Sequence, residues 1–131
     1  MIGLDTNILV RYFVKDHPEQ TRLASNLICA LSPMEPGWVG LTTILELIWA
    51  VKKIYHVDRA GIIQILDTLI ASRDIVIENG DTVRQALWLH RIGKADFADC
   101  LIACSARAAG CTRTVTFDQI AARDAGIQLL A

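Results

Sequence analysis

Four acidic side chains lie where an apolar run gives way to a predicted helix or turn. They are Asp5, Glu46, Asp99 and Asp118. Carboxylate oxygens with no His or Cys beside them are the donors that Mg²⁺ and Mn²⁺ prefer in proteins. A divalent ion held in this way can generate hydroxide, orient a phosphate and neutralise the charge that develops on a leaving oxygen. The four acids therefore point to metal-assisted hydrolysis of a phosphodiester.

A bound cation would also relieve repulsion among these acids if they converge. Two carboxylates about 4 Å apart repel by roughly 4 kcal/mol at an effective dielectric constant near 20. A small domain is stabilised by only about 5–15 kcal/mol in all. Several close carboxylate pairs would therefore require either a cation or raised pKa values.

Each acid also has a simpler interpretation as a helix-capping group. Asp5 stands between a predicted strand and a predicted helix, which is the place of an N-cap. Thr43 and Glu46 have the spacing of a capping box, and Asp96 followed by Asp99 matches a cap with an acid suited to the helix dipole. The sequence leaves capping open for each acid taken singly.

Strand and helix patterns alternate along the whole chain. Short apolar or β-branched runs predict strands near residues 2–4, 38–41, 75–77, 112–116 and 127–130. Helical periodicity and capping signals predict helices near residues 6–13, 19–31, 42–55, 59–72, 81–91, 97–109 and 119–123. This alternation predicts an α/β fold, with one domain over residues 1–131 and a parallel β-sheet of about five strands flanked by helices. Right-handed crossovers would bring all four acids to one edge of that sheet.

The composition narrows the class of protein further. The net charge of −1 gives no overall basic character, so any polyanion would need a local basic patch. No apolar run approaches the roughly 18 residues that suggest a membrane span. Asp5 and Arg11 interrupt any signal-peptide pattern, and we therefore expect a cytoplasmic protein that uses no membrane. The cysteines show no metal-site spacing and are predicted to be small core residues.

One helix pattern predicts a partner chain. Residues 42–55 are apolar around nearly the whole helix, and 53% of the chain is hydrophobic. A helix that is apolar all round needs burial all round. In a domain of this size, we expect one side of that helix to meet a partner subunit.

Four stretches of the chain, in this order and over this length, resemble a PIN-domain ribonuclease. They are Leu4-Asp5-Thr6-Asn7, the lone Glu46 on an apolar helix, Asp96-Phe97-Ala98-Asp99-Cys100-Leu101-Ile102-Ala103, and Thr116-Phe117-Asp118. More closely, the chain is similar to a VapC-type toxin of a type II toxin–antitoxin pair. The resemblance implies a parallel sheet with a central first strand and a Mg²⁺- or Mn²⁺-dependent endoribonuclease site. It also implies a homodimer and a small VapB-like antitoxin whose tail blocks the site.

The resemblance assigns roles to the four acids by position. Asp5 and Asp99 match the chief metal-binding acids of the family. Glu46 and Asp118 match the other two acids of the set. All four are thus expected to be catalytic and to hold the metal.

The resemblance also implies supporting residues. Thr6 and Asn7 match polar residues that help to hold the first acid and a water at the metal. Asp96 matches a position that is acidic in many relatives and not in many others, so both a helix cap and a supporting role stay open. Thr116 matches a small polar position beside the last acid.

Basic and aromatic residues are the candidates for contacts with RNA. The basic candidates flank Asp5 and Asp96 in sequence, and they are Arg11, Lys15, Arg91 and Lys94. The alternative for each of them is a solvated surface position without a role in binding. The three tryptophans lie within apolar runs, which predicts core or interface positions rather than platforms for stacking bases.

Three other classes share parts of this pattern. An aspartyl-phosphate phosphatase also has an Asp after its first strand, but it needs a second Asp where this chain has Asn7. A phospho-acceptor receiver domain needs an early acidic pair and a late Lys, whereas the only late bases here are Arg113 and Arg123. A PIN-like interaction module without nuclease activity is the third class, and the complete set of acids argues against it.

Overall fold

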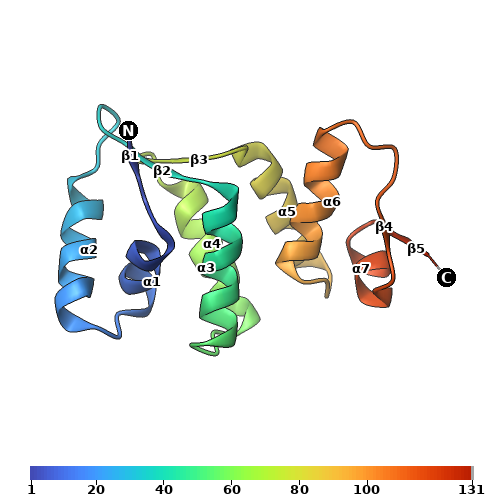
Figure 1. Ribbon diagram of the computed structural model, residues 1–131, viewed down its shortest axis with the longest axis horizontal. Helices are drawn as coiled ribbons and strands as arrows, with labels where there is room; N and C mark the ends of the chain where they lie inside the picture. The colour runs from blue at the N-terminus through green and yellow to red at the C-terminus, as the bar shows by residue number, and fades with distance from the viewer. Residues whose placement is uncertain (131) are drawn as a thin grey trace. The chain divides into compact units, whose positions relative to one another are not determined.

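The computed structural model describes residues 1–130 of the chain. They belong to two compact units, Met1–Glu78 (unit 1) and Asn79–Ala131 (unit 2), and each unit is described by itself. In Figure 1, unit 1 is coloured from blue to yellow-green and unit 2 from yellow to red. No helix in the described part of the chain has the length and apolar character that a membrane crossing needs.

Unit 1 is built on three short parallel strands. Their order in the sheet is β1-β2-β3, with Ile2 opposite Gly37 and Gly37 opposite Ile75. In Figure 1 the strands run along the top of unit 1 and its helices lie below them. The elements in chain order are β1 (Ile2–Gly3), α1 (Thr6–Val14), α2 (Pro18–Ala30), β2 (Gly37–Val39), α3 (Leu41–Lys53), α4 (Arg59–Ala71) and β3 (Ile75–Ile77).

The core of unit 1 lies where α1 and α3 pack under the strands. Leu9 of α1 and Val39 of β2 are fully buried, as are Leu47 and Val51 on one face of α3. Gly37 lies against the core, and a Cβ there would stand 2.9 Å from Leu4 Cδ1, so a side chain at this position would require Leu4 to move. The sequence places apolar residues at helical spacing on these elements, and burying them holds the helices against the sheet.

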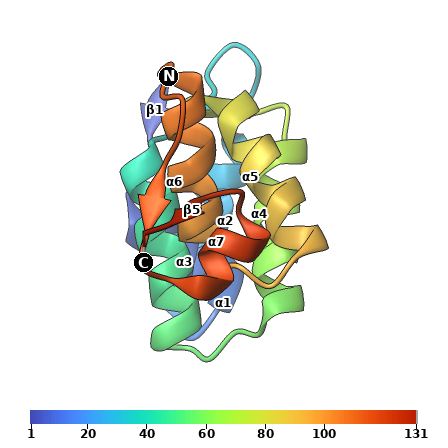
Figure 2. The same cartoon turned by 90° about the vertical axis from the view of Figure 1, so that its right-hand side faces the viewer.

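Unit 2 consists of an antiparallel helix pair and a small two-stranded sheet. Figure 2 shows α5 and α6 side by side in this unit. Phe97, Cys100 and Cys104 on α6 are buried, while Val83 and Leu87 on α5 form the matching apolar stripe. The elements in chain order are α5 (Gly80–Ile92), α6 (Phe97–Ala108), β4 (Val115–Thr116), α7 (Gln119–Asp124) and β5 (Gln128–Leu129). β4 and β5 are parallel, with Val115 opposite Gln128.

The predicted α/β class, with a parallel sheet flanked by helices, is confirmed. The prediction of about five strands in one sheet is wrong for the described residues, because β4 and β5 pair with each other in a separate sheet. The central first strand implied by the resemblance is also wrong there, since β2 lies in the middle of its sheet and β1 at an edge. Short apolar runs locate strands, but pairing depends on partners far away in the sequence. One domain over residues 1–131 stays a prediction.

Candidate active site

Asp5 lies two residues beyond the end of β1 and is the N-cap of α1. Its Oδ1 accepts a hydrogen bond from the Thr6 N–H at 2.7 Å, and its side chain is exposed. The strand ends where Leu4 N–H donates to Trp38 O at 2.9 Å. Capping uses one carboxylate oxygen, so it does not exclude a second role for the acid.

Glu46 does not belong to a capping box. Helix α3 begins at Leu41 with Gly40 as its N-cap, so Thr43 lies inside the helix. The sequence had predicted Glu46 in the first turn of this helix. Because α3 begins at Leu41, Glu46 lies in its second turn. Instead, Glu78 accepts a hydrogen bond from the Leu41 N–H at 2.8 Å. Within residues 1–130 the structure gives the exposed Glu46 carboxylate no hydrogen bond or ion pair.

These two glutamates should respond oppositely to truncation. Glu78→Ala should lower the free energy of unfolding by about 1 kcal/mol, because it leaves the first N–H of α3 without its protein acceptor. Glu46→Ala should not lower it, because Ala is a good helix former and no capping bond is lost. Urea unfolding of both variants and the parent measures this. Equal destabilisation by the two changes would contradict the assignment of the cap to Glu78.

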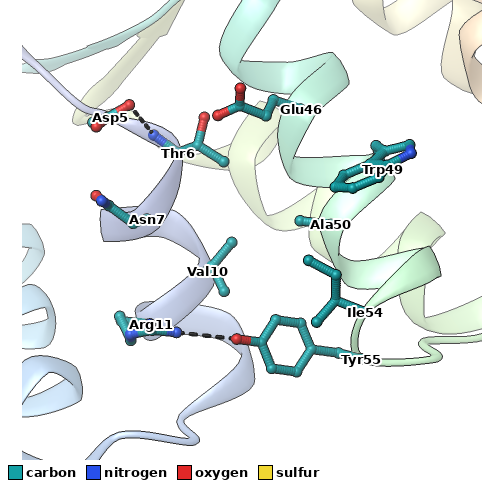
Figure 3. A pocket seen from close by; sticks show the side chains of 10 residues that line it. All are labelled: Asp5, Thr6, Asn7, Val10, Arg11, Glu46, Trp49, Ala50, Ile54 and Tyr55. Atoms are coloured by element: carbon teal, nitrogen blue, oxygen red, sulfur yellow. Dashed lines mark hydrogen bonds between the residues drawn. The ribbon is translucent and has the colours of Figure 1, made fainter.

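Asp5 and Glu46 line one pocket of about 510 Å³ between α1 and α3. Figure 3 shows the Thr6 hydroxyl and the Glu46 carboxylate pointing toward each other, with Asp5 beside them. Asn7 lines the same end of the pocket. The first turn of α1 thus supplies one acid with its polar neighbours, and α3 supplies the second acid from across the pocket.

The other end of this pocket is aromatic, apolar and basic. Its walls include Trp49 and Ile54 from the α3 side and Val10 from α1 (Figure 3). Trp49 is 58% exposed. The sequence interpretation missed this end, although Trp49 follows Glu46 by three residues and such a pair shares one helix face.

A hydrogen-bond network fixes Arg11 at the basic end. Its Nε donates to Gln20 Oε1 at 2.7 Å, and its Nη1 donates to Asp16 Oδ1 at 3.1 Å. The same Nη1 donates to the Tyr55 hydroxyl at 3.1 Å, as Figure 3 shows. The pKa of Asp16 is lowered, chiefly by a hydrogen bond from the Tyr55 hydroxyl and also by the charge of Arg11. Arg11 is therefore held in place beside the pocket rather than moving freely in solvent.

The lowered pKa of Asp16 gives a pH prediction. Because the folded pKa lies below the ordinary value of 3.8, the stability that this carboxylate contributes is complete above pH 3.8. It is lost as the pH falls through the lowered pKa. Tyr55→Phe should raise the pKa of Asp16 toward 3.8, whereas Tyr12→Phe, a matched change outside the network, should leave it unchanged. Carbon NMR titration of the Asp16 carboxyl group measures this, and an unchanged pKa in Tyr55→Phe would contradict it.

The remaining acids lie in unit 2, at the starts of two helices. Asp96 is the N-cap of α6, and Asp99 lies half-buried in its first turn. Asp118 caps α7 by accepting a hydrogen bond from the Ala121 N–H at 2.9 Å. Thr116 Oγ1 accepts a hydrogen bond from the Asp118 N–H at 3.0 Å, and its supporting role at the last acid stays a prediction.

The structure thus brings part of the predicted site together. Asp5, Thr6, Asn7 and Glu46 share one pocket of unit 1, while the other predicted acids belong to unit 2. Over residues 1–130, no three His, Cys, Asp or Glu side chains within either unit lie close enough to hold a metal ion. The convergence of all four acids on one edge stays a prediction.

The basic candidates differ in their settings. Arg11 lines the pocket, and Lys15 ends α1 in the left-handed conformation with φ of 61°. Arg91 is exposed in the last turn of α5. The backbone N–H of Lys94 donates to Asp124 Oδ2 at 2.7 Å. Only Arg11 is built into the acidic pocket of unit 1.

The tryptophans are not core residues. Trp49 and Trp88 are 58% and 60% exposed, and Trp38 is 37% exposed. Leu45 is also exposed, so one face of α3 is uncovered in the isolated chain, and the expected partner subunit on that face stays a prediction. Apolar periodicity identifies which face can be buried, but it does not show whether anything covers it.

The parallel sheet flanked by helices defines an α/β protein, and two acids of unit 1 share one pocket between α1 and α3. The chain belongs to the PIN domain family, whose model matches residues 2–126. A comparison with curated proteins finds no match. PIN domains are generally nucleases, which supports a hydrolase that acts on nucleic acid.

Proposed function

We propose that this protein is a metal-dependent endoribonuclease that hydrolyses RNA phosphodiester bonds. The observation that carries the proposal is the joint pocket of Asp5 and Glu46, placed after β1 and after β2 in a chain of the PIN domain family. In parallel α/β sheets, ligands bind outside the carboxyl ends of the strands. The pocket therefore has both the position and the acidic groups of a hydrolytic site.

The donor set of this pocket fits Mg²⁺ or Mn²⁺. Its acidic end offers only oxygen donors apart from amide nitrogen, and hard divalent cations prefer oxygen. Asp5 and Glu46 would hold the ion, and the family resemblance alone adds Asp99 and Asp118 as proposed ligands. When bound, such an ion supplies activated water and charge neutralisation for phosphoryl transfer.

The chain's own residues prepare this pocket for a strand of RNA. The Thr6 N–H fixes the rotamer of Asp5 through its hydrogen bond. Arg11, held by Gln20 and Tyr55, offers a fixed cation at the other end, where it can pair with a phosphate of the strand. The buried side chains of Val10 and Ala50 form apolar walls of the pocket.

Cleavage of RNA by the purified chain tests the proposal. We expect cleavage in Mg²⁺ or Mn²⁺, none after chelation, and recovery when either ion is added back. The size and ends of the fragments distinguish internal cuts from trimming of termini. Metal-independent cleavage, or no cleavage of total cellular RNA in either metal, would contradict the proposal.

We further propose that the protein acts in the cytoplasm as the toxin of a type II toxin–antitoxin pair and is a homodimer inhibited by a VapB-like antitoxin. Its support is the sequence resemblance together with the exposed Leu45 and Trp49 on α3, which offer an apolar face to a partner.

Expression in cells should arrest growth, and Asp5→Asn should relieve the arrest. Light scattering should give a dimer mass. A lack of both arrest and cleavage would favour an interaction module.

A further inference from the structure

Unit 2 contains a small pocket whose lining includes none of the acids of the proposed site. It has a volume of about 250 Å³ and lies where the end of α6 approaches the segment before β4. Two arginines, Arg107 and Arg113, line it together with Thr112 and Thr114. No acidic side chain is among its lining residues in the described part of the chain. Two cations thus share one small polar pocket.

Neither arginine has a carboxylate partner among the ion pairs of residues 1–130. Elsewhere in unit 2, Arg84 pairs with Asp81 at 2.8 Å and Arg123 pairs with Asp124 at 3.0 Å. Like charges near one another repel, and an anion between them would turn this repulsion into attraction. The charge of the pocket therefore favours an anionic ligand.

The pocket is built from fixed parts. Arg113 Nη1 donates to Gln128 Oε1 at 3.1 Å, and the Gln128 N–H donates to Thr114 O at 2.8 Å, which ties Arg113 to the β4–β5 ladder. Gly126, with φ of 71°, forms part of the wall, and a Cβ there would stand 3.8 Å from Arg107 Nη2. Both arginine side chains are exposed, and Arg113 is held by its hydrogen bond to Gln128.

The carbonyl groups at the end of α6 repel an anion less strongly than they would if they had no hydrogen-bond donors. The C-terminus of a helix carries partial negative charge on its last carbonyl groups. Here the Gly110 N–H donates to Arg107 O, and the Cys111 N–H donates to Ala106 O, at 3.0 Å each. Two of these carbonyls are therefore satisfied, and the positive charge of Arg107 lies beside them.

We propose that this pocket binds a phosphate group. The planar guanidinium matches the oxygens of phosphate in a bidentate arrangement, and threonine hydroxyls can donate to the remaining oxygens. A volume of about 250 Å³ is below the range of roughly 300–1,000 Å³ that is typical of whole drug-sized ligands. The pocket therefore takes one phosphate group, either a phosphate of a nucleic-acid strand or that of a small phosphate compound.

NMR titration of the full chain with inorganic phosphate, at constant ionic strength set with chloride, tests this inference. The amide signals of Thr112, Thr114 and Gly126 should shift and saturate. Arg107→Gln and Arg113→Gln should each raise the dissociation constant by about tenfold or more, because each removes a charge-assisted hydrogen bond. Arg84→Gln, which removes another exposed charge of unit 2 from α5, should leave it unchanged. Shifts that do not saturate, or equal effects of all three variants, would overturn the proposal.

A second titration identifies the source of the phosphate. Short single-stranded RNA with and without a 5′-phosphate is added in the presence of a chelator, so that it stays intact. Equal shifts with both strands assign the pocket to backbone phosphates, and removing one arginine should then reduce the salt dependence of binding by roughly 0.7 in logarithmic slope. Shifts that need the 5′-phosphate assign it to a terminal phosphate, and shifts with inorganic phosphate alone assign it to small phosphates. Asp5→Asn should not change phosphate binding, so this test is independent of the proposed nuclease activity.

Discussion

Asp5→Asn should lower the rate of RNA cleavage by at least about a hundredfold and leave the fold intact. Changes near a metal already cost about 10–100-fold when they remove only an outer partner of a ligand, so loss of a ligand charge should cost more. The fold should survive because Asn and Asp are about equally good N-caps. The Asn carbonyl oxygen can still accept the hydrogen bond that Asp5 takes from the Thr6 N–H. Cleavage assays in Mg²⁺, with circular dichroism of the same sample, measure both effects.

Asp58→Asn is the matched control for this experiment. Asp58 is the N-cap of α4 and accepts a hydrogen bond from the Gly61 N–H at 2.9 Å, but it does not line the acidic pocket. The same chemical change at Asp58 should leave cleavage unaltered. If Asp5→Asn cleaved RNA as fast as the parent, the assignment of Asp5 as a catalytic acid would fail.

Asp99→Asn should have an effect of similar size, at least about a hundredfold on cleavage. Asp99 lies inside the first turn of α6, whose N-cap is Asp96, so the helix should still begin at the same place when residue 99 is Asn. Retained stability with lost cleavage would separate a role at the metal from a role in folding. The same assay, run alongside thermal unfolding, provides both readouts.

Asp96→Asn separates the two acids of α6. Asp96 is the N-cap, and Asn at this position remains a good cap. We expect this variant to cleave within about tenfold of the parent rate, as for a supporting group. If Asp96→Asn lost as much activity as Asp99→Asn, Asp96 would belong among the essential acids.

Much of the secondary structure was predictable because its signals are local. Asp58 caps α4, Pro18 is the first residue of α2, and the β-branched run at residues 75–77 forms β3. Gly110, with φ of 96°, lies just beyond the end of α6. Each of these signals depends on the chemistry of a few adjacent residues, which a single sequence contains in full.

The start of α3 was not predictable in this way. Thr42 and Thr43 are good N-cap residues, yet the helix begins before them, at Leu41. Its first N–H is satisfied by Glu78, which lies 37 residues further along the chain. A distant acceptor of this kind leaves no signal in the sequence near the helix. Because the helix begins at Leu41, Glu46 is not a capping residue, and its carboxylate is available to the pocket.

The candidate site was predictable only in part. The position of Asp5 after a predicted strand identified it as a candidate, and the family resemblance identified Glu46. The structure places both residues in the lining of one pocket. Trp49, Tyr55 and Ile54 were missed because apolar and aromatic residues in a helix are more often core, and only the fold shows which of them remain exposed. Strand pairing was missed for the same physical reason, since it is decided between distant segments.

The shared pocket of Asp5 and Glu46 has a consequence for the evolution of this sequence. Two like charges beside one pocket oppose folding, and natural proteins often trade stability for activity at such places. Asp5 recovers part of this cost by capping α1, whereas Glu46 has no such compensation in the described structure. A lineage released from selection for cleavage should therefore lose the acid on α3 first and keep the aspartate after β1 longer.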